Sequence, residues 1–346
     1  MARPFRYHRL TPGGAHIATL IDAPTHRVLL TGASGTLGRN FLDAVEGRPD
    51  VIVLAALREG SRTPRLSPAV EVARIETFDR PNLQALTRAF RPTAVVHCAA
   101  TGMEFPQTRW FDLIRFNVDV TITLCECAAE IPACQFIFVS TGLAYRAQGR
   151  PLVEDDCLDT LHPYGASKAA ADLLVRSAAA EFAVPLTVLR PFGFTGPGDD
   201  RNRLFPTLLR AAASRQPVAL SAGTQVRDHC SARDIAAGIV RAMEVHPGSG
   251  ARVYNLGSGR EEPIRTLVEG VRDELDLAVD LRFGERPLGR FEPVHLVADT
   301  RRVADELGWR PRHNLAHAVW QLAQESFPGL SVREPRENVP GTATAR

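Results

Sequence analysis

Tyr164 and Lys168 are the two residues of this sequence whose types and spacing most clearly indicate chemistry. Lys168 is the one lysine among the 41 lysines and arginines of the 346-residue chain. An ammonium group can change its pKa with its surroundings, whereas a guanidinium stays charged. Residues four apart lie on the same face of a helix, so the phenol and the ammonium can address one ligand. The spacing predicts a catalytic site around Lys168; the alternative is a surface lysine that lies near a tyrosine by chance.

A glycine-rich turn follows the apolar run 28–31 and precedes the amphipathic stretch 37–45. Glycines at such a turn let the backbone approach a pyrophosphate, and the N–H groups and dipole of the next helix stabilise the anion. The order strand, glycine turn, helix therefore predicts a dinucleotide site at the start of the sheet. The expected contacts are Gly32, Ser34, Gly35, Thr36, Leu37, Gly38 and Arg39.

The end of the second apolar run, 51–56, bears on which dinucleotide is bound. An acidic residue there would hydrogen-bond the ribose 2′-hydroxyl, whereas an arginine accommodates a 2′-phosphate. The run ends on Ala55 and Ala56, Arg58 follows, and Arg39 can point to the same place. This pattern favours NADP, and NAD stays open because the chain uses arginine at almost every basic position.

Short apolar runs alternate with longer amphipathic stretches between residues 27 and 190. Uninterrupted apolar strands that alternate with helices indicate a parallel sheet covered on both faces. We therefore predict an α/β fold, a doubly wound parallel sheet of the Rossmann type, with a smaller mixed α/β substrate-binding region at 191–330. The expected strands are 28–31, 51–56, 94–98, 136–140 and 186–190, and the expected helices are 37–45, 83–90, 111–129 and 164–182.

Composition excludes several other classes of protein. A net charge of +2 argues against a nucleic-acid partner, and no apolar stretch is long enough to span a membrane. Six cysteines without metal-type spacing predict buried, reduced thiols in a cytoplasmic protein and no metal site. Residues 1–26 are interpreted as a flexible extension, with a transit peptide as the alternative, and 331–346 as a disordered tail.

Two predicted strand ends carry polar residues where open α/β sheets bind ligands. The hydroxyl of Thr141 can hydrogen-bond a substrate oxygen beside Tyr164; the alternative is a helix cap or a turn. His97 is predicted to be structural, because a single histidine at the end of a strand more often packs or bonds neighbouring groups than catalyses.

These segments together resemble the extended short-chain dehydrogenase/reductase family, which includes nucleotide-sugar epimerases, dehydratases and 4-ketoreductases. The resemblance covers roughly residues 27–325 and depends on the order and spacing of several motifs. The motifs are TGASGTLG at 31–38, HCAA at 97–100, FNVDVT at 116–121, FVSTGLAY at 138–145, PYGASK at 163–168, LRPFGFTGPGD at 189–199, VRDHCSARDIA at 226–236, YNLGSG at 254–259 and ELGWRP at 306–311.

The resemblance implies roles for individual residues. Tyr164 would be the general acid/base, and Lys168 would bind the nicotinamide ribose and lower the tyrosine pKa through its charge. Thr141 matches the residue that orients the reacting oxygen, and Asn117 matches the asparagine of the helix behind the site. Ala99, within HCAA, would contact the cofactor.

The resemblance also implies binding residues outside this centre. Glu76 would replace the usual acid that contacts the adenine. Arg227 matches the family's arginine for the substrate diphosphate and Arg286 would be a second, since a guanidinium grips phosphate oxygens in pairs. The alternative for either arginine is a solvated surface charge.

Two departures from the family pattern narrow the expected activity. Gly142 and Leu143 occupy the place where the dehydratases carry an Asp-Glu pair, so dehydration is not expected. Gly193 stands where many members have a substrate-binding asparagine, which weakens the case for a standard sugar nucleotide.

The favoured function is therefore an NAD(P)-dependent oxidoreductase that transfers hydride at a secondary alcohol or ketone of a nucleotide-linked sugar. Because residues 196–206 look most like the 4-ketoreductases, reduction of a 4-keto-6-deoxyhexose is the main hypothesis. The alternative is a nucleotide-sugar 4-epimerase with tightly bound NAD, and the remote alternative is a non-catalytic dinucleotide sensor. The resemblance also implies a homodimer through the helices at 111–129 and 164–182, with alanines at 169–171 and 178–180 allowing close packing.

Overall fold

The computed structural model describes residues 25–61, 70–102, 108–199, 202–248 and 250–335. The predicted N-terminal extension and C-terminal tail therefore lie almost wholly outside the described residues. The described chain divides into two compact units built from interleaved segments. The first unit comprises the chain up to Ser140, Ala166–Leu189 and Ile239–Val253. The second unit comprises Thr141–Gly165, Arg190–Gly238 and the chain from Tyr254 onward.

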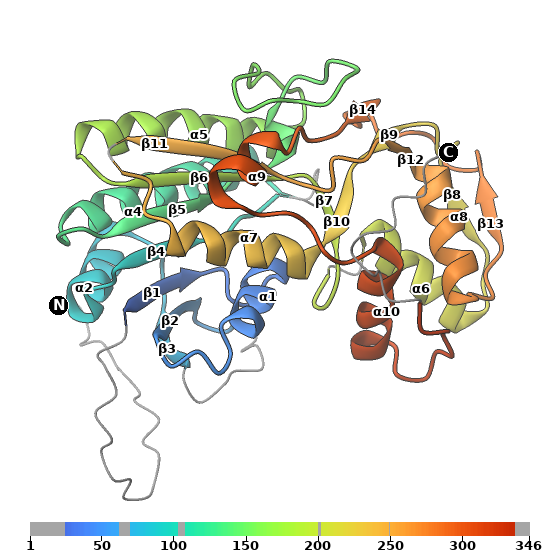
Figure 1. Cartoon of the computed structure of the whole chain (residues 1–346), viewed down its shortest axis with the longest axis horizontal. Helices are drawn as coiled ribbons and strands as arrows, with labels where there is room; N and C mark the ends of the chain where they lie inside the picture. Colours follow the sequence, from blue (N-terminus) through green and yellow to red (C-terminus); the bar gives the residue numbers. More distant parts are fainter. Residues whose placement is uncertain (1–24, 62–69, 103–107, 200–201, 249, 336–346) are drawn as a thin grey trace, which may run out of the picture. The chain divides into compact units, whose positions relative to one another are not determined.

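Within the described residues, a seven-stranded sheet has the strand order β11-β6-β5-β4-β1-β2-β3 (Figure 1). The pairs from β6 to β3 are all parallel, which confirms the predicted doubly wound α/β class. The order reverses between β1 and β4, where such sheets bind ligands. The strands are β1 His26–Thr31, β2 Val51–Arg58, β3 Val70–Ile75, β4 Ala94–His97, β5 Gln135–Val139, β6 Leu186–Pro191 and β11 Ala251–Leu256.

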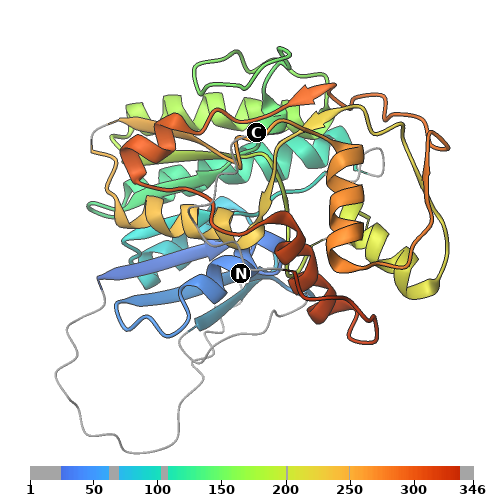
Figure 2. The ribbon, with the colours of Figure 1, turned by 45° about the vertical axis from the view of Figure 1, so that its right-hand side comes forward.

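Helices cover both faces of this sheet (Figures 1 and 2). One face carries α2 (Arg80–Phe90), α4 (Val120–Ala129) and α5 (Pro163–Glu181), which share a single apolar cluster with the strands. The other face carries α1 (Thr36–Ala44) and α7 (Ala232–Glu244). Arg48, just after α1, forms an ion pair with Glu244 at the end of α7, which places these two helix ends together.

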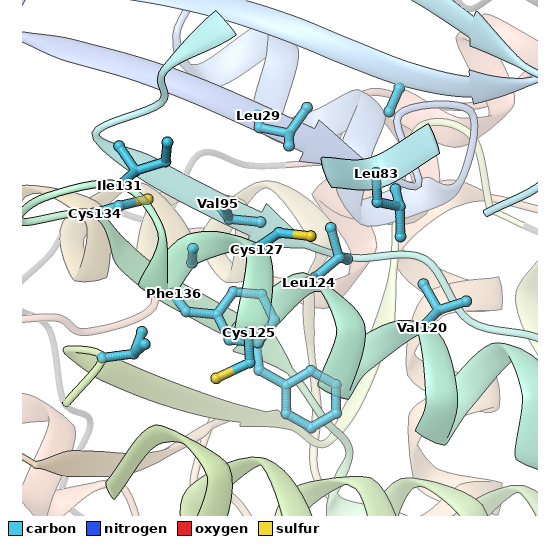
Figure 3. Packing of buried hydrophobic residues seen from close by; sticks show 14 of the residues in the cluster. Leu29, Leu83, Val95, Val120, Leu124, Cys125, Cys127, Ile131, Cys134 and Phe136 are labelled. Atoms are coloured by element: carbon cyan, nitrogen blue, oxygen red, sulfur yellow. The ribbon is translucent and has the colours of Figure 1, made fainter. Parts of the chain in front are cut away.

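The apolar cluster explains why α4 and α2 take their positions. Leu124 and Cys125 of α4 and Leu83 of α2 belong to one buried cluster with Val95 and Phe136 of the sheet (Figure 3). All five side chains are fully buried. Burying an aliphatic or aromatic side chain of this size stabilises the fold by about 1.5–3 kcal/mol. The two helices are therefore held on this face mainly by apolar burial.

The helical run predicted at 111–129 is divided into three parts. It begins as α3 (Trp110–Leu113), passes through the π-helical segment η1 (Ile114–Asp119) and continues as α4. π-helical turns inside longer helices are rare and often occur at functional sites. This one carries Asn117, one of the predicted site residues.

The second unit has a core of its own. Residues of α6, α8 and α10 and of the paired strands β8 and β13 form one buried cluster. Helices of 11 and 12 residues occur in this region, for which the sequence predicted a mixed α/β character. The elements are β7 Gly193–Thr195, α6 Leu204–Ser214, β8 Val218–Leu220, β9 Val226–Arg227, β10 His229–Ser231, β12 Glu262–Pro263, α8 Ile264–Leu275, β13 Leu281–Phe283, β14 His295–Leu296, α9 Arg301–Leu307 and α10 Leu315–Ser326, preceded by the short 3-10 helix η2 Gly142–Ala144.

Candidate active site

The glycine turn between β1 and α1 has a shape that only glycine permits at two positions. Gly32 has a φ of +79°, and a Cβ atom there would lie 2.5 Å from the backbone nitrogen of Ala99. A Cβ atom at Gly38 would clash with the carbonyl oxygen of Gly32. Gly35 closes the turn by donating its N–H to the oxygen of Gly32 at 3.0 Å and is the N-cap of α1. The turn thus presents bare backbone at a helix N-terminus, which is the arrangement that binds a pyrophosphate.

A cavity of about 280 Å³ lies at this turn, at the carboxyl ends of β1, β2 and β4. Its position coincides with the reversal of the strand order between β1 and β4. Five predicted cofactor contacts line it: Gly32, Ser34, Gly35, Arg58 and Ala99. The other lining residues are Ala56, Leu57, Ser61, Phe78, Cys98, Ala100, Thr101, Phe116 and Val120.

Six predicted cofactor contacts are not among the residues that line this cavity: Thr36, Leu37, Gly38, Arg39, Glu76 and Lys168. Glu76 is exposed and does not belong to the lining, whereas Phe78, two residues later, does. Arg39 is half-buried and also lies outside the lining. Sequence reasoning missed Phe78 because nothing in the one-dimensional pattern distinguishes this ring from the other apolar residues before α2.

Lys168 is fully buried within α5. Its Nζ atom has no hydrogen-bond partner among the described residues and lies 4.1 Å from the centre of the Phe138 ring. Burial lowers the pKa of the Lys168 ammonium to about 7, and the nearby groups of Cys98 and Asp172 partly oppose that shift. A buried ammonium with unsatisfied donors is costly unless a ligand supplies acceptors. Cys98, which influences the pKa of Lys168, lines the cavity, whereas Lys168 itself does not belong to the lining. Its contact with the ribose hydroxyls of a dinucleotide stays a prediction.

Asn117 in η1 connects α5 to the loop after β4 by hydrogen bonds. Its Nδ2 atom donates to the carbonyl oxygen of Thr101 at 2.9 Å and to the hydroxyl of Ser167 at 2.8 Å. Its Oδ1 atom accepts from the N–H of Thr101 at 2.9 Å. The amide is fully buried and its groups are occupied by these bonds. Asn117 therefore acts here as a positioning residue for Ser167, which directly precedes Lys168.

His97 is structural, as predicted. Thr121 donates its hydroxyl to the carbonyl oxygen of Asn117, so it accepts from Nε2–H of His97 at 3.0 Å. The other ring nitrogen, Nδ1, then accepts from the hydroxyl of Thr31 at 2.6 Å. Burial, with the charge of Lys168, lowers the pKa of His97 well below its usual value, and the ring is therefore neutral.

Tyr164 lies in the first turn of α5, one turn before Lys168 on the same continuous helix. Its side chain is buried, and burial raises the pKa of the phenol to about 12, with the charge of Arg203 opposing the shift. A Cβ atom at Gly165 would clash with the carbonyl oxygen of Leu143, so this glycine lets the loop after Thr141 approach the start of α5 closely.

Thr141 forms the N-cap of η2. Its hydroxyl oxygen accepts from the N–H of Leu143 at 3.2 Å. The turn role that was the alternative for this residue is therefore present. The hydroxyl proton is not used in that bond, so Thr141 keeps a donor for a ligand oxygen.

The predicted diphosphate arginines differ in their surroundings. Arg227 is buried; its guanidinium pairs with the carboxylate of Glu292 and donates to the carbonyl oxygen of Pro293 at 2.6 Å. Arg286 is exposed, and its backbone N–H donates to the carbonyl oxygen of Leu220 at 3.1 Å. The Arg227 guanidinium is thus engaged by acceptors of the chain itself, and the role of either arginine at a substrate diphosphate stays a prediction.

Gly193 leaves no room for the asparagine that many family members carry. It lies opposite His229 where β7 and β10 pair in parallel. A Cβ atom at Gly193 would clash with the carbonyl oxygen of Asp228 and would lie 2.8 Å from Nδ1 of His229. The space of the missing side chain is therefore filled by β10.

The cysteines correct one expectation. All six are free and all lie within the described residues, but only Cys125, Cys127, Cys134 and Cys230 are buried. Cys98 is half-buried and Cys157 is exposed. The described residues contain no cluster of histidine, cysteine and acidic residues suited to a metal ion. None of the helices in the described ranges is long and apolar enough to cross a membrane.

Comparison with known proteins decides the family. A model of the NAD dependent epimerase/dehydratase family matches residues 28–257. The chain belongs to this family. The matched range runs from β1 to the end of β11, so it includes the glycine turn, Tyr164, Lys168 and Arg227.

Several known proteins resemble this chain over most of its length. A UDP-glucose 4-epimerase of Azospirillum brasilense is 27% identical over 351 residues, covering 94% of this chain and 98% of that protein. The structure of MoeE5 in complex with UDP-glucose and NAD has a TM-score of 0.76 at 26% identity and covers 88% of this chain and 100% of its own. MoeE5 in complex with UDP-glucuronic acid and NAD has the same TM-score at 25% identity.

Proposed function

We propose that this protein is a nucleotide-sugar 4-epimerase that uses NAD and acts on a UDP-hexose. The main hypothesis from the sequence was a 4-ketoreductase, with the epimerase as the alternative. The similarity to UDP-glucose 4-epimerases over most of the chain now favours the alternative. The observation that carries the proposal is Lys168, a buried and unpaired ammonium one helical turn after a buried tyrosine.

The residues present fit a dinucleotide. Gly32 and Gly38 allow the close backbone contacts that shape the turn, and the N-terminus of α1 is placed where a pyrophosphate would bind. The unsatisfied donors of Lys168 suit the hydroxyls of the nicotinamide ribose. NAD, when bound, supplies an acceptor that takes the C4 hydride of the sugar and gives it back.

The protein's own part in the reaction is proton transfer and charge. Oη of Tyr164 takes the proton of the sugar hydroxyl during oxidation and returns it during reduction, while Thr141 donates a hydrogen bond to the same oxygen. Burial raises the pKa of the Tyr164 phenol to about 12, so added positive charge close to its oxygen is needed to make it a base near neutral pH. Lys168 supplies that charge from the same face of α5.

A cofactor-release experiment tests the proposal. Denaturing the purified protein should release NAD, and the native protein should convert UDP-glucose into UDP-galactose with no added cofactor. The matched control is the Tyr164→Phe protein, which should still contain NAD but should not turn over. A protein that carries no dinucleotide and consumes NADPH in proportion to the product would contradict the epimerase proposal.

An NADP-dependent 4-ketoreductase remains the second candidate, because of the cavity wall at the end of β2. Arg58 and Ser61 line that wall, and none of the described residues lining the cavity is acidic. Such a wall suits a 2′-phosphate. A non-catalytic sensor is the weakest candidate, because such a protein would have no use for a buried Tyr–Lys pair.

We also propose a homodimer. Trp110, Phe111 and Ile114 at the start of the α3–α4 helical run and Leu173 and Leu174 of α5 are each more than half exposed. Exposed apolar groups on neighbouring helices of one sheet face are typical of a subunit interface. Of the six alanines expected there, Ala169, Ala171 and Ala179 are buried, Ala170 and Ala178 are half-buried, and Ala180 is exposed.

Sedimentation equilibrium tests the dimer. The wild-type protein should sediment as a dimer at micromolar concentration, and the double variant Leu173→Asp, Leu174→Asp should sediment as a folded monomer. Leu288→Asp, at an exposed leucine of the other unit, serves as the control and should leave the dimer intact. A wild-type monomer would refute the proposal.

A further inference from the structure

The ring of Phe138 is the group that faces the Lys168 ammonium from the sheet. Phe138 lies on β5 and is fully buried, and its ring centre is 4.1 Å from Nζ. Nζ has no hydrogen-bond partner among the described residues. A cation over the face of an aromatic ring is attracted by the negative charge of that face, most strongly where water is excluded.

The ring of His97 packs against the ring of Phe138 and limits its orientation. The two rings stack, with 5.8 Å between their centres and an angle of 21° between their planes. His97 is held by hydrogen bonds at both nitrogens and is neutral, so it adds no competing positive charge. Phe138 therefore has a defined orientation, and its face is directed by the fold rather than by the lysine.

We propose that Phe138 is a positioning residue that holds Lys168 in its ammonium form at the cofactor site. No part of the family match or of the names of the relatives assigns this role. Its effect on the charge of Lys168 does not depend on the substrate, whereas its effect on turnover rests on the proposed function.

The other groups that face Lys168 do not replace the ring. Cys98, after β4, is a thiol whose pKa burial raises to about 12, so it carries no charge at neutral pH. Asp172, one turn later in α5, is fully buried and already forms an ion pair with Arg176 at 3.0 Å. His97 is neutral. The ring of Phe138 is thus the contact that offsets the cost of burying this ammonium from the side of the sheet.

The expected shift has a definite sign. The ring stabilises the charged form of Lys168, so its removal lowers the pKa of the amine further below the present value of about 7. A cation–π contact in a desolvated site corresponds to a shift of about one pH unit. As the pH is raised, activity that requires the ammonium form of Lys168 should therefore be lost at a lower pH than in the wild type.

The sequence makes a direct measurement possible, because Lys168 is the single lysine of the chain. Protein grown with ¹³C-lysine gives one side-chain Cε signal, whose pH titration reports the pKa of Lys168 without substrate or cofactor. We expect Phe138→Leu to lower that pKa by about one unit. Phe136→Leu is the matched control, because Phe136 is equally buried on the same face of β5 and stacks on His97 at 6.3 Å but has no contact with Nζ in the described structure.

A fluorinated phenylalanine placed at position 138 separates the charge effect from the loss of volume. It keeps the shape of the ring but weakens the negative charge of its face, so it should lower the pKa of Lys168 in the same direction, and it serves if Phe138→Leu does not fold. An unchanged pKa in the fluorinated protein, or an equal shift in Phe136→Leu, would overturn the proposal. If the NMR shift is observed but the protein has no epimerase or reductase activity, the inference stands and the proposed function fails.

Discussion

Replacing Tyr164 with phenylalanine should lower kcat by about a thousandfold, since a positioned general acid/base contributes roughly 10²–10⁴ in rate. The substitution removes one oxygen from a buried ring and leaves the rest of α5 in place, so the protein should fold and bind the dinucleotide as before. Steady-state kinetics with UDP-glucose, together with the dinucleotide content of the purified protein, measures both parts.

Tyr145→Phe is the matched control for that experiment. Tyr145 is also buried, and its hydroxyl accepts from Arg190 at 2.6 Å and donates to Asn255 at 2.7 Å. Removing it takes one hydrogen bond from the buried Arg190 and one from the buried Asn255, which costs about 1–3 kcal/mol of stability. We therefore expect Tyr145→Phe to lower the Tm and Tyr164→Phe to lower the rate. Equal turnover in Tyr164→Phe and the wild type would exclude Tyr164 as the acid/base.

Lys168→Arg should abolish most of the activity although it keeps the positive charge. The side chain is fully enclosed, so the longer and planar guanidinium has to displace Phe138 or the loop at Cys98. Overpacking a closed site of this kind costs about 1–3 kcal/mol. The guanidinium also cannot reproduce a compact ammonium that binds hydroxyls from one point. We expect a loss of at least about 10²-fold in kcat/KM, which corresponds to roughly 2.7 kcal/mol of transition-state stabilisation.

Lys168→Met tests the effect of the Lys168 charge separately from the effect of its side-chain shape. Without the ammonium, Arg203 is the charge left to oppose the effect of burial on the Tyr164 pKa, so the fraction of phenolate, and with it the residual rate, should rise with pH up to at least pH 10. The wild type should instead lose activity at alkaline pH as Lys168 gives up its proton. A pH–rate profile for Lys168→Met that has the shape of the wild-type profile would show that the charge of Lys168 does not act on Tyr164.

The amino-acid sequence by itself determined the interior of the sheet and the chemistry at its edge. Strands β1, β2, β4, β5 and β6 are buried on both faces and therefore appear as unbroken apolar runs, which were all predicted. The glycine turn was predictable because its need for bare backbone is local. The pairing of Tyr164 with Lys168 was predictable because a helix places residues four apart on one face.

The edge strands and the surroundings of the site were decided by the tertiary structure alone. Strands β3 and β11 lie at the two edges of the sheet, where neighbours cover them incompletely, so their mixed patterns did not predict strands. Phe138 looked like any core residue until α5 brought Lys168 over its ring. The reason why Gly193 carries no side chain is seen only where β10 packs against it, because a Cβ atom there would clash with Asp228. These features depend on contacts between segments far apart in the chain, and a local pattern carries no information about which segments will meet.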